Sequence, residues 1–215
     1  MLAAKLLGWM LLGLVRLLTG AQARWWGCPP KAEQRIYFAN HQSHLDLVMI
    51  WAALPEELRS ITRPIAARDY WANTPLKRWI TTEVFNAIYV ERGGTPAPAE
   101  AGAPPPDPMA PLQPLVEALT SGDSIIIFPE GTRGHTGEPQ KFKSGLFTLA
   151  QMFPDVVLVP AWIDNVQRVM PKGEIVPVPI LCSVTFGAPI ALAPGEERRA
   201  FLDRARDAVI ALRHI

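Results

Sequence analysis

An imidazole and a carboxylate stand five positions apart in the segment Asn-His-Gln-Ser-His-Leu-Asp, at residues 40–46. The segment lies where an apolar, strand-like run at 36–39 gives way to a helix-like run. On one continuous α-helix His41 and Asp46 would point about 140° apart, so a working pair needs His41 on the connecting turn and Asp46 inside the helix. A neutral imidazole held by a carboxylate is a general base with its tautomer already chosen.

The same residues have a simpler interpretation, in which Ser43 and Asp46 form a Ser-x-x-Asp helix cap and His41 has no chemical role. A second segment favours chemistry. Residues 124–133 read Ser-Ile-Ile-Ile-Phe-Pro-Glu-Gly-Thr-Arg, again an apolar run that ends in a polar turn containing glycine. Two strand ends of this kind predict one shared pocket.

The two segments resemble the motifs of the glycerolipid acyltransferases, the family that includes 1-acylglycerol-3-phosphate acyltransferase. Asn-His-x-Ser-x-x-Asp is met at 40–46, and Phe-Pro-Glu-Gly-Thr-Arg is met in full at 128–133, followed by Phe-Lys-Ser-Gly at 142–145. A third match, Asn-Ala-Ile-Tyr-Val-Glu-Arg at 86–92, has Asn86 where the family commonly has glycine. Asparagine also tolerates left-handed backbone angles, so this departure is a mild one.

The resemblance implies roles for individual residues. His41 would be the general base and Asp46 the group that orients it. The expected substrate-binding residues, which include a phosphate clamp of two arginines, are Arg92, Glu130, Gly131, Thr132, Arg133 and Lys143. Backbone amides of the turn at 41–44 are candidates for stabilising an oxyanion, and Ser43 is expected to cap the helix and not to act as a nucleophile.

The implied reaction moves an acyl chain from acyl-CoA or acyl-carrier protein to the free hydroxyl of lysophosphatidate, giving phosphatidate. No metal or organic cofactor is implied. One alternative is an acyltransferase that acts on glycerol 3-phosphate or on another lysolipid. An alternative of a different class is a non-catalytic, membrane-bound lipid-binding protein.

Composition excludes several other classes. The formal net charge is +1, which argues against general nucleic-acid binding. Cys28 and Cys182 lie far apart, and neither has a histidine or cysteine at metal-ligand spacing. The chain carries neither a Walker-type loop nor a dinucleotide fingerprint.

The amino-terminal segment at 1–20 is rich in leucine and interrupted by Lys5 and Arg16. These cations are eleven positions apart, which on a helix is about three turns plus roughly 20°, so they share one face. The segment is therefore expected to lie in a membrane interface with its cations reaching the headgroups. A spanning helix and a secretory signal ending at Ala21-Gln-Ala23 are the alternatives. Trp25 and Trp26 follow, and indole is favoured at that depth.

The remaining chain predicts an α/β fold, a mixed β-sheet flanked by helices. Residues 1–27 are expected to form the membrane-associating helix and residues 28–215 the acyltransferase domain, with a Pro/Gly/Ala-rich surface insertion at 93–108. The expected location is a membrane, at the cytoplasmic face of the inner or plasma membrane. The predicted strands are 35–39, 61–67, 87–91, 124–128, 156–163 and 180–186. The predicted helices are 45–54, 75–82, 111–120, 145–152 and 196–213.

Overall fold

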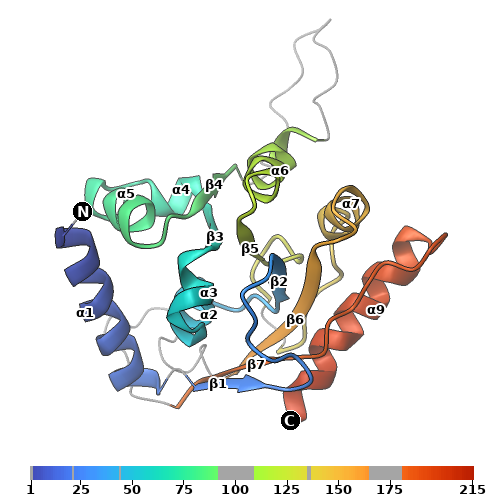
Figure 1. Cartoon of the computed structure of the whole chain (residues 1–215), viewed down its shortest axis with the longest axis horizontal. Helices are drawn as coiled ribbons and strands as arrows, with labels where there is room; N and C mark the ends of the chain where they lie inside the picture. The colour runs from blue at the N-terminus through green and yellow to red at the C-terminus, as the bar shows by residue number, and fades with distance from the viewer. Residues whose placement is uncertain (1, 21, 44, 92–108, 135–136, 165–180) are drawn as a thin grey trace, which may run out of the picture.

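A mixed β-sheet forms the centre of the computed structural model, which describes residues 2–20, 22–43, 45–91, 109–134, 137–164 and 181–215. Within these residues the sheet has seven strands in the order β1-β7-β6-β2-β5-β3-β4 (Figure 1). The strands are β1 (Gln22–Trp25), β2 (Arg35–Ala39), β3 (Thr62–Ala67), β4 (Ile88–Val90), β5 (Ser124–Ile127), β6 (Val157–Asp164) and β7 (Ser183–Phe186). Strands β2 to β6 are parallel, and β7 runs antiparallel to β6 and parallel to β1. The mixed sheet predicted from the sequence is therefore confirmed.

Helices cover both faces of the sheet. The longer helices are α1 (Leu2–Thr19), α2 (Asp46–Ala53), α6 (Gln113–Thr120), α7 (Gly145–Met152) and α9 (Arg198–Ala211). The shorter segments are α3 (Glu56–Ser60), α4 (Arg68–Trp71), α5 (Pro75–Trp79), η1 (Ile80–Val84), η2 (Ala110–Leu112) and η3 (Leu212–His214). One core cluster packs the sheet against α2, and a second packs it against α6, α7 and α9.

The position of β2 explains its composition. All five of its residues are buried, because β2 lies between β5 and β6 and has helices on both faces. Ile36 and Phe38 face the cluster that contains α6, α7 and α9, whereas Tyr37 and Ala39 face the cluster that contains α2. A parallel strand covered on both sides reads as a continuous apolar run, which is why this strand is evident in the sequence.

Three elements were not predicted, namely β1, α3 and α4. Residues 22–25 pair in parallel with β7, and the Trp25 ring stacks on Phe186 with centroids 4.2 Å apart. The sheet thus begins before residue 28. Trp25 belongs to a strand of this sheet and not to an unpaired segment after the amino-terminal helix. The predicted helix at 75–82 is α5 continued by η1, a π-helical turn that ends with the Phe85 N–H bonded to the Ile80 carbonyl. The insertion expected at 93–108 lies outside the described residues.

Helix α1 packs along the outside of α2 and η1 (Figure 1). Leu12 and Thr19 are buried on its inner side, where the Thr19 hydroxyl bonds the Val15 carbonyl and contacts the Met49 sulfur. The opposite side exposes Leu6, Trp9, Met10, Leu14 and Leu17. None of the helices in the described part of the chain is long and apolar enough to cross a membrane.

Candidate active site

The two polar turns identified in the sequence lie side by side. Strands β2 and β5 are parallel neighbours in register from Ile36 opposite Ile125 to Phe38 opposite Ile127, so both turns leave the same edge of the sheet. A backbone hydrogen bond of 2.8 Å from Gly134 N to the His41 carbonyl joins them directly. Strand β4 runs in the same direction and ends at this edge as well.

His41 and Asp46 form the expected pair. His41 Nδ1 lies 2.9 Å from Asp46 Oδ2, with His41 on the turn and Asp46 at the first residue of α2. The His41 side chain is 19% exposed and that of Asp46 only 1%. A carboxylate can only accept hydrogen bonds, so this contact places the proton on Nδ1 and leaves the Nε2 lone pair free to take a proton.

Asp46 also holds the turn together. Its Oδ2 accepts hydrogen bonds from Gln42 N at 2.5 Å and Ser43 N at 2.7 Å, while the Ser43 hydroxyl accepts one from Leu45 N at 3.2 Å. The capping arrangement predicted from the sequence is therefore only half formed. The Asp46 carboxylate bonds back to the backbone of the turn, as a capping box requires. The Ser43 hydroxyl, however, bonds the N–H two residues ahead instead of three. The backbone N–H groups of residues 42 and 43 already donate to the Asp46 carboxylate. The expectation that they stabilise an oxyanion is therefore wrong for both.

Glu130 is buried beneath the two turns. Its side chain is 2% exposed; Oε1 accepts from His41 N and Oε2 from Gln140 N, each at 2.7 Å. Burial raises the pKa of Glu130, and the two backbone N–H groups of Gln140 and His41 oppose that rise. The carboxylate thus ties the turn that carries His41 to the segment that follows residues 128–133.

Two further contacts position His41, and sequence reasoning assigned neither. The Phe128 ring stacks on the imidazole with centroids 4.4 Å apart and 18° between the planes. In the buried side chain of Asn40, Nδ2 donates to the carbonyl of Ile163 in β6 at 3.0 Å, and Oδ1 accepts from Ile163 N at 2.8 Å. Both residues belong to the quoted motifs, but only the folded chain shows what their side chains touch.

The remaining predicted residues lie around the same turn, with one outside the described part. Gly131 has φ +68°, and a Cβ there would come within 2.6 Å of Lys143 Nζ, so the Lys143 side chain lies across this glycine. Thr132 and Arg133 are exposed just beyond it. Arg92 follows the end of β4 by two positions but falls outside the described residues.

An apolar cleft of about 270 Å³ opens beside His41. Its walls come from β3, β4, β5, α6 and α7, and Gly131 and Lys143 also line it. The apolar lining comprises Ile65, Leu112, Leu115, Ile127, Leu146 and Leu149, among others. The arrangement combines a base, a cation and a hydrophobic slot at one edge of the sheet.

Known proteins resemble this chain in sequence and in fold. A family model described as Acyltransferase matches residues 29–164. The 1-acyl-sn-glycerol-3-phosphate acyltransferase alpha of Mus musculus is 30% identical over 148 residues, which cover 67% of this chain and 45% of that protein. The protein of the same name from Homo sapiens is 29% identical over 189 residues, 85% of this chain and 60% of the human protein.

The solved structure of the 1-acyl-sn-glycerophosphate acyltransferase from Thermotoga maritima shares the fold, with a TM-score of 0.66 and 20% identity. The match covers 99% of this chain and 80% of that one. The chain spans about half the length of the curated relatives it matches. With a family model that covers most of the sheet and both polar turns, the chain belongs to the acyltransferase family.

Proposed function

We propose that the chain transfers an acyl group from acyl-CoA or acyl-carrier protein to the free hydroxyl of 1-acylglycerol 3-phosphate, giving phosphatidate. The observation that carries this proposal is the His41–Asp46 pair at the mouth of an apolar cleft. The names of the mammalian relatives point to the same acceptor. An acyl chain needs an apolar slot, and an alcohol needs a base to become a nucleophile.

In the proposed reaction His41 Nε2 takes the proton of the acceptor hydroxyl as its oxygen attacks the thioester carbon. The tetrahedral intermediate then expels the thiolate. The imidazolium gives the proton that it took from the acceptor to this thiolate, which leaves as the free thiol. Asp46 stabilises the imidazolium through Nδ1, and Phe128 keeps the ring in one plane. Lys143 lines the cleft beside His41 and is the nearest candidate for meeting negative charge on the donor or the intermediate.

A thiol-release assay with purified protein tests the proposal. Release of thiol from an acyl-CoA that depends on added lysophosphatidate is the expected result. Release with glycerol 3-phosphate or another lysolipid, and not with lysophosphatidate, would assign a different acceptor. Saturable lipid binding without any release over the whole acceptor panel would identify a non-catalytic lipid-binding protein.

The acceptor phosphate is proposed to bind Arg133 and Arg92, with Gly131 and Thr132 forming the turn beside it. Replacing Arg133 with alanine is expected to weaken use of lysophosphatidate by roughly 10- to 150-fold, because a charge-assisted contact is worth about 1.5–3 kcal/mol. The effect should fall on the apparent KM for the acceptor, measured by steady-state kinetics.

Arg199→Ala is the matched control, since Arg199 is an exposed arginine on α9 and lies in none of the motifs. Arg133→Lys should restore part of the loss, because lysine keeps the charge without the bidentate fork. If the KM for the thioester rises and that for the acceptor does not, the two arginines serve the donor.

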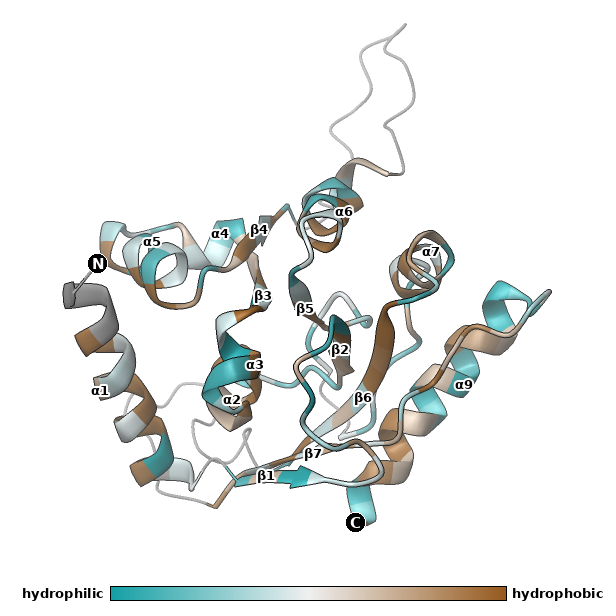
Figure 2. Ribbon diagram, in the orientation of Figure 1, coloured by the Kyte–Doolittle hydropathy of each residue, from teal (hydrophilic) through white to brown (hydrophobic). Residues whose placement is uncertain are grey.

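Helix α1 is proposed to dock the enzyme on a membrane, at the cytoplasmic face where the thioester donors are made. Figure 2 shows that much of α1 is hydrophobic, and the helical spacing puts its exposed apolar residues on one side, with Arg16 at the edge of that side. The α5 residues Leu76 and Trp79 are exposed close by, since α5 continues into η1, which contacts α1. Cleavage after Ala23 would cut through β1, so the same arrangement argues against a removed signal.

Leu14→Glu is expected to lower partition of the protein into phospholipid vesicles by about ten- to a hundredfold, because it removes a leucine from the apolar face and adds a charge. Cosedimentation measures the partition. Met152→Glu on α7 is the matched control, with 46% of Met152 exposed against 49% of Leu14. Equal losses in the two variants would show that α1 has no special part in docking.

A further inference from the structure

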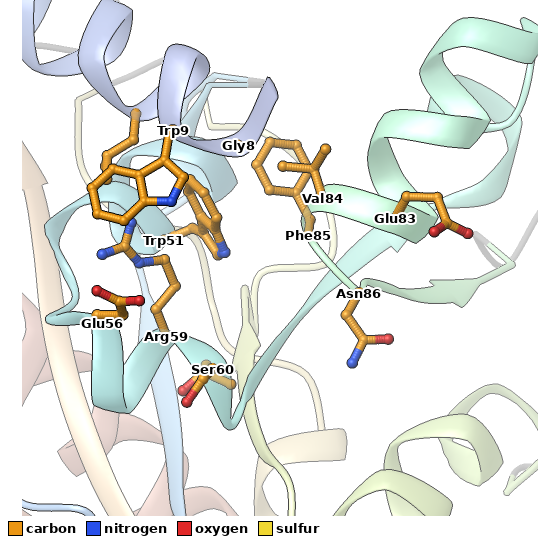
Figure 3. Close-up of a pocket in the computed structure, with 12 residues that line it drawn as sticks. Gly8, Trp9, Trp51, Glu56, Arg59, Ser60, Glu83, Val84, Phe85 and Asn86 are labelled. Carbon is orange, nitrogen blue, oxygen red and sulfur yellow. The ribbon is translucent and has the colours of Figure 1, made fainter. Parts of the chain in front are cut away.

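A second cavity lies beneath α1, away from His41. It has a volume of about 270 Å³ and is enclosed by α1, the end of α2, α3 and the segment 83–86 (Figure 3). It shares no lining residue with the cleft beside His41. The proposed acyl-transfer chemistry leaves this cavity without a role.

Arg59, in the last turn of α3, is the cation of this cavity. Its guanidinium lies over the Trp51 ring at 4.9 Å, and its buried Nε has no hydrogen-bond partner within the described residues. It also forms no ion pair in that part of the structure. Burial lowers the pKa of Arg59, and nearby Arg16 lowers it further. Buried donors are nearly always partnered in folded proteins, so the unpartnered Nε can serve an anion that enters the cavity.

The rest of the lining is amphipathic. Figure 3 shows Trp9 and Trp51 beside the guanidinium, with Asn86 across the cavity. Asn86 is exposed and has φ +46°, the left-handed backbone that presents its amide at this corner. Trp9 is 64% exposed and also belongs to the apolar side of α1. A ligand in this cavity would therefore meet the guanidinium beside the proposed membrane face, with Asn86 on the far side.

Two carboxylates also line the cavity. Glu83 points away from Arg59 in Figure 3. Glu56 lies one turn before Arg59, is exposed, and makes no ion pair with it within 4.0 Å in the described structure. Its charge nevertheless raises the pKa of Arg59, so Glu56 competes with any anion that approaches.

We propose that this cavity binds the headgroup of an anionic phospholipid, with the phosphate against Arg59 and the acyl chains along the apolar side of α1. A bilayer phospholipid is the ligand whose phosphate matches the guanidinium and whose acyl chains match the apolar side of α1. The inference rests on the proposed docking of α1 and is independent of the acyl-transfer reaction. The bound lipid would hold the enzyme on anionic regions of the membrane.

Flotation with vesicles of phosphatidylcholine, alone or mixed equally with phosphatidylglycerol, tests the site. The protein is expected to prefer the mixed vesicles, and Arg59→Gln should reduce that preference by about tenfold, the loss typical of one charge-assisted contact. Arg199→Gln removes the same charge from α9 and should change the preference by less than about twofold. Glu56→Gln should strengthen it, because the competing carboxylate is gone. Circular dichroism of each variant checks folding.

A second titration removes the need for a bilayer. Dihexanoylphosphatidylglycerol, kept below its micelle concentration, is expected to bind saturably, with Arg59→Gln weakening binding about tenfold and Arg133→Ala leaving it unchanged. No saturable binding to the wild-type protein would overturn the site, even if α1 docks on vesicles. Equal losses of binding in Arg59→Gln and Arg199→Gln would show that binding comes from general electrostatic attraction and not from this cavity. Displacement of the lipid by inorganic phosphate at similar concentration would identify a small-anion site instead.

Discussion

The His41→Ala variant is expected to lose about two to four orders of magnitude in turnover, the range typical for removal of a general base. Among the described residues that line the cleft, His41 is the only histidine, and its Nε2 is free to take a proton. The fold should be retained, because the His41 backbone bonds to Glu130 and Gly134 do not depend on its side chain. Thiol release at saturating acceptor measures the loss, and circular dichroism checks the fold.

Asp46→Asn is the companion measurement. The base remains in that variant, and an amide oxygen at the Oδ2 position can still accept the three bonds from His41, Gln42 and Ser43, with the NH₂ at the Oδ1 position, which has no partner within the described residues. The negative charge that stabilises the imidazolium is lost. Its turnover should fall less than that of His41→Ala. Near-normal acyl transfer by a folded His41→Ala protein would show that His41 is not the general base.

Replacing Glu130 with alanine is expected to lower the free energy of unfolding by about 2–6 kcal/mol, because two backbone amides lose their acceptor and each such loss costs about 1–3 kcal/mol. Turnover should fall with it, since one of these amides belongs to His41. Denaturant unfolding measures the stability, and steady-state kinetics below the unfolding transition measures the turnover.

Glu130→Gln separates positioning from substrate contact. Glutamine keeps one carbonyl oxygen for an amide but sets its NH₂ against the other, so about half of the stability loss should remain. A positioning role predicts a lower kcat with the acceptor KM little changed. A raised KM for lysophosphatidate in a variant of normal stability would instead mean that Glu130 contacts the substrate.

The secondary structure of the catalytic edge was predictable because its strands are buried on both faces. The runs at 36–39 and 125–128 are apolar throughout, and they form most of β2 and β5. Helix α7 was predicted at its observed bounds. Strand β1 and helices α3 and α4 were missed because four or five residues carry too little periodicity to be told from a loop.

The partners of individual side chains were less predictable. The motifs named His41, Asp46 and Glu130, but the bond from Glu130 to the His41 amide joins residues 89 positions apart. The stacking of Phe128 on His41 crosses a similar separation. Such contacts depend on which strands become neighbours, and local sequence does not encode strand order.

The residue types and their spacing identified the candidate functional features, namely a base with its carboxylate, a second polar turn and an apolar helix at the amino terminus. These are local properties, set by side-chain chemistry and by the periods of helix and strand. Only the tertiary structure decided that β2 and β5 pair, that carboxylates occupy the turn amides, and that Arg59 Nε finds no partner among the described residues beneath α1. Each of these depends on packing between distant segments, where burial removes water and leaves every polar group dependent on whichever neighbour the fold supplies.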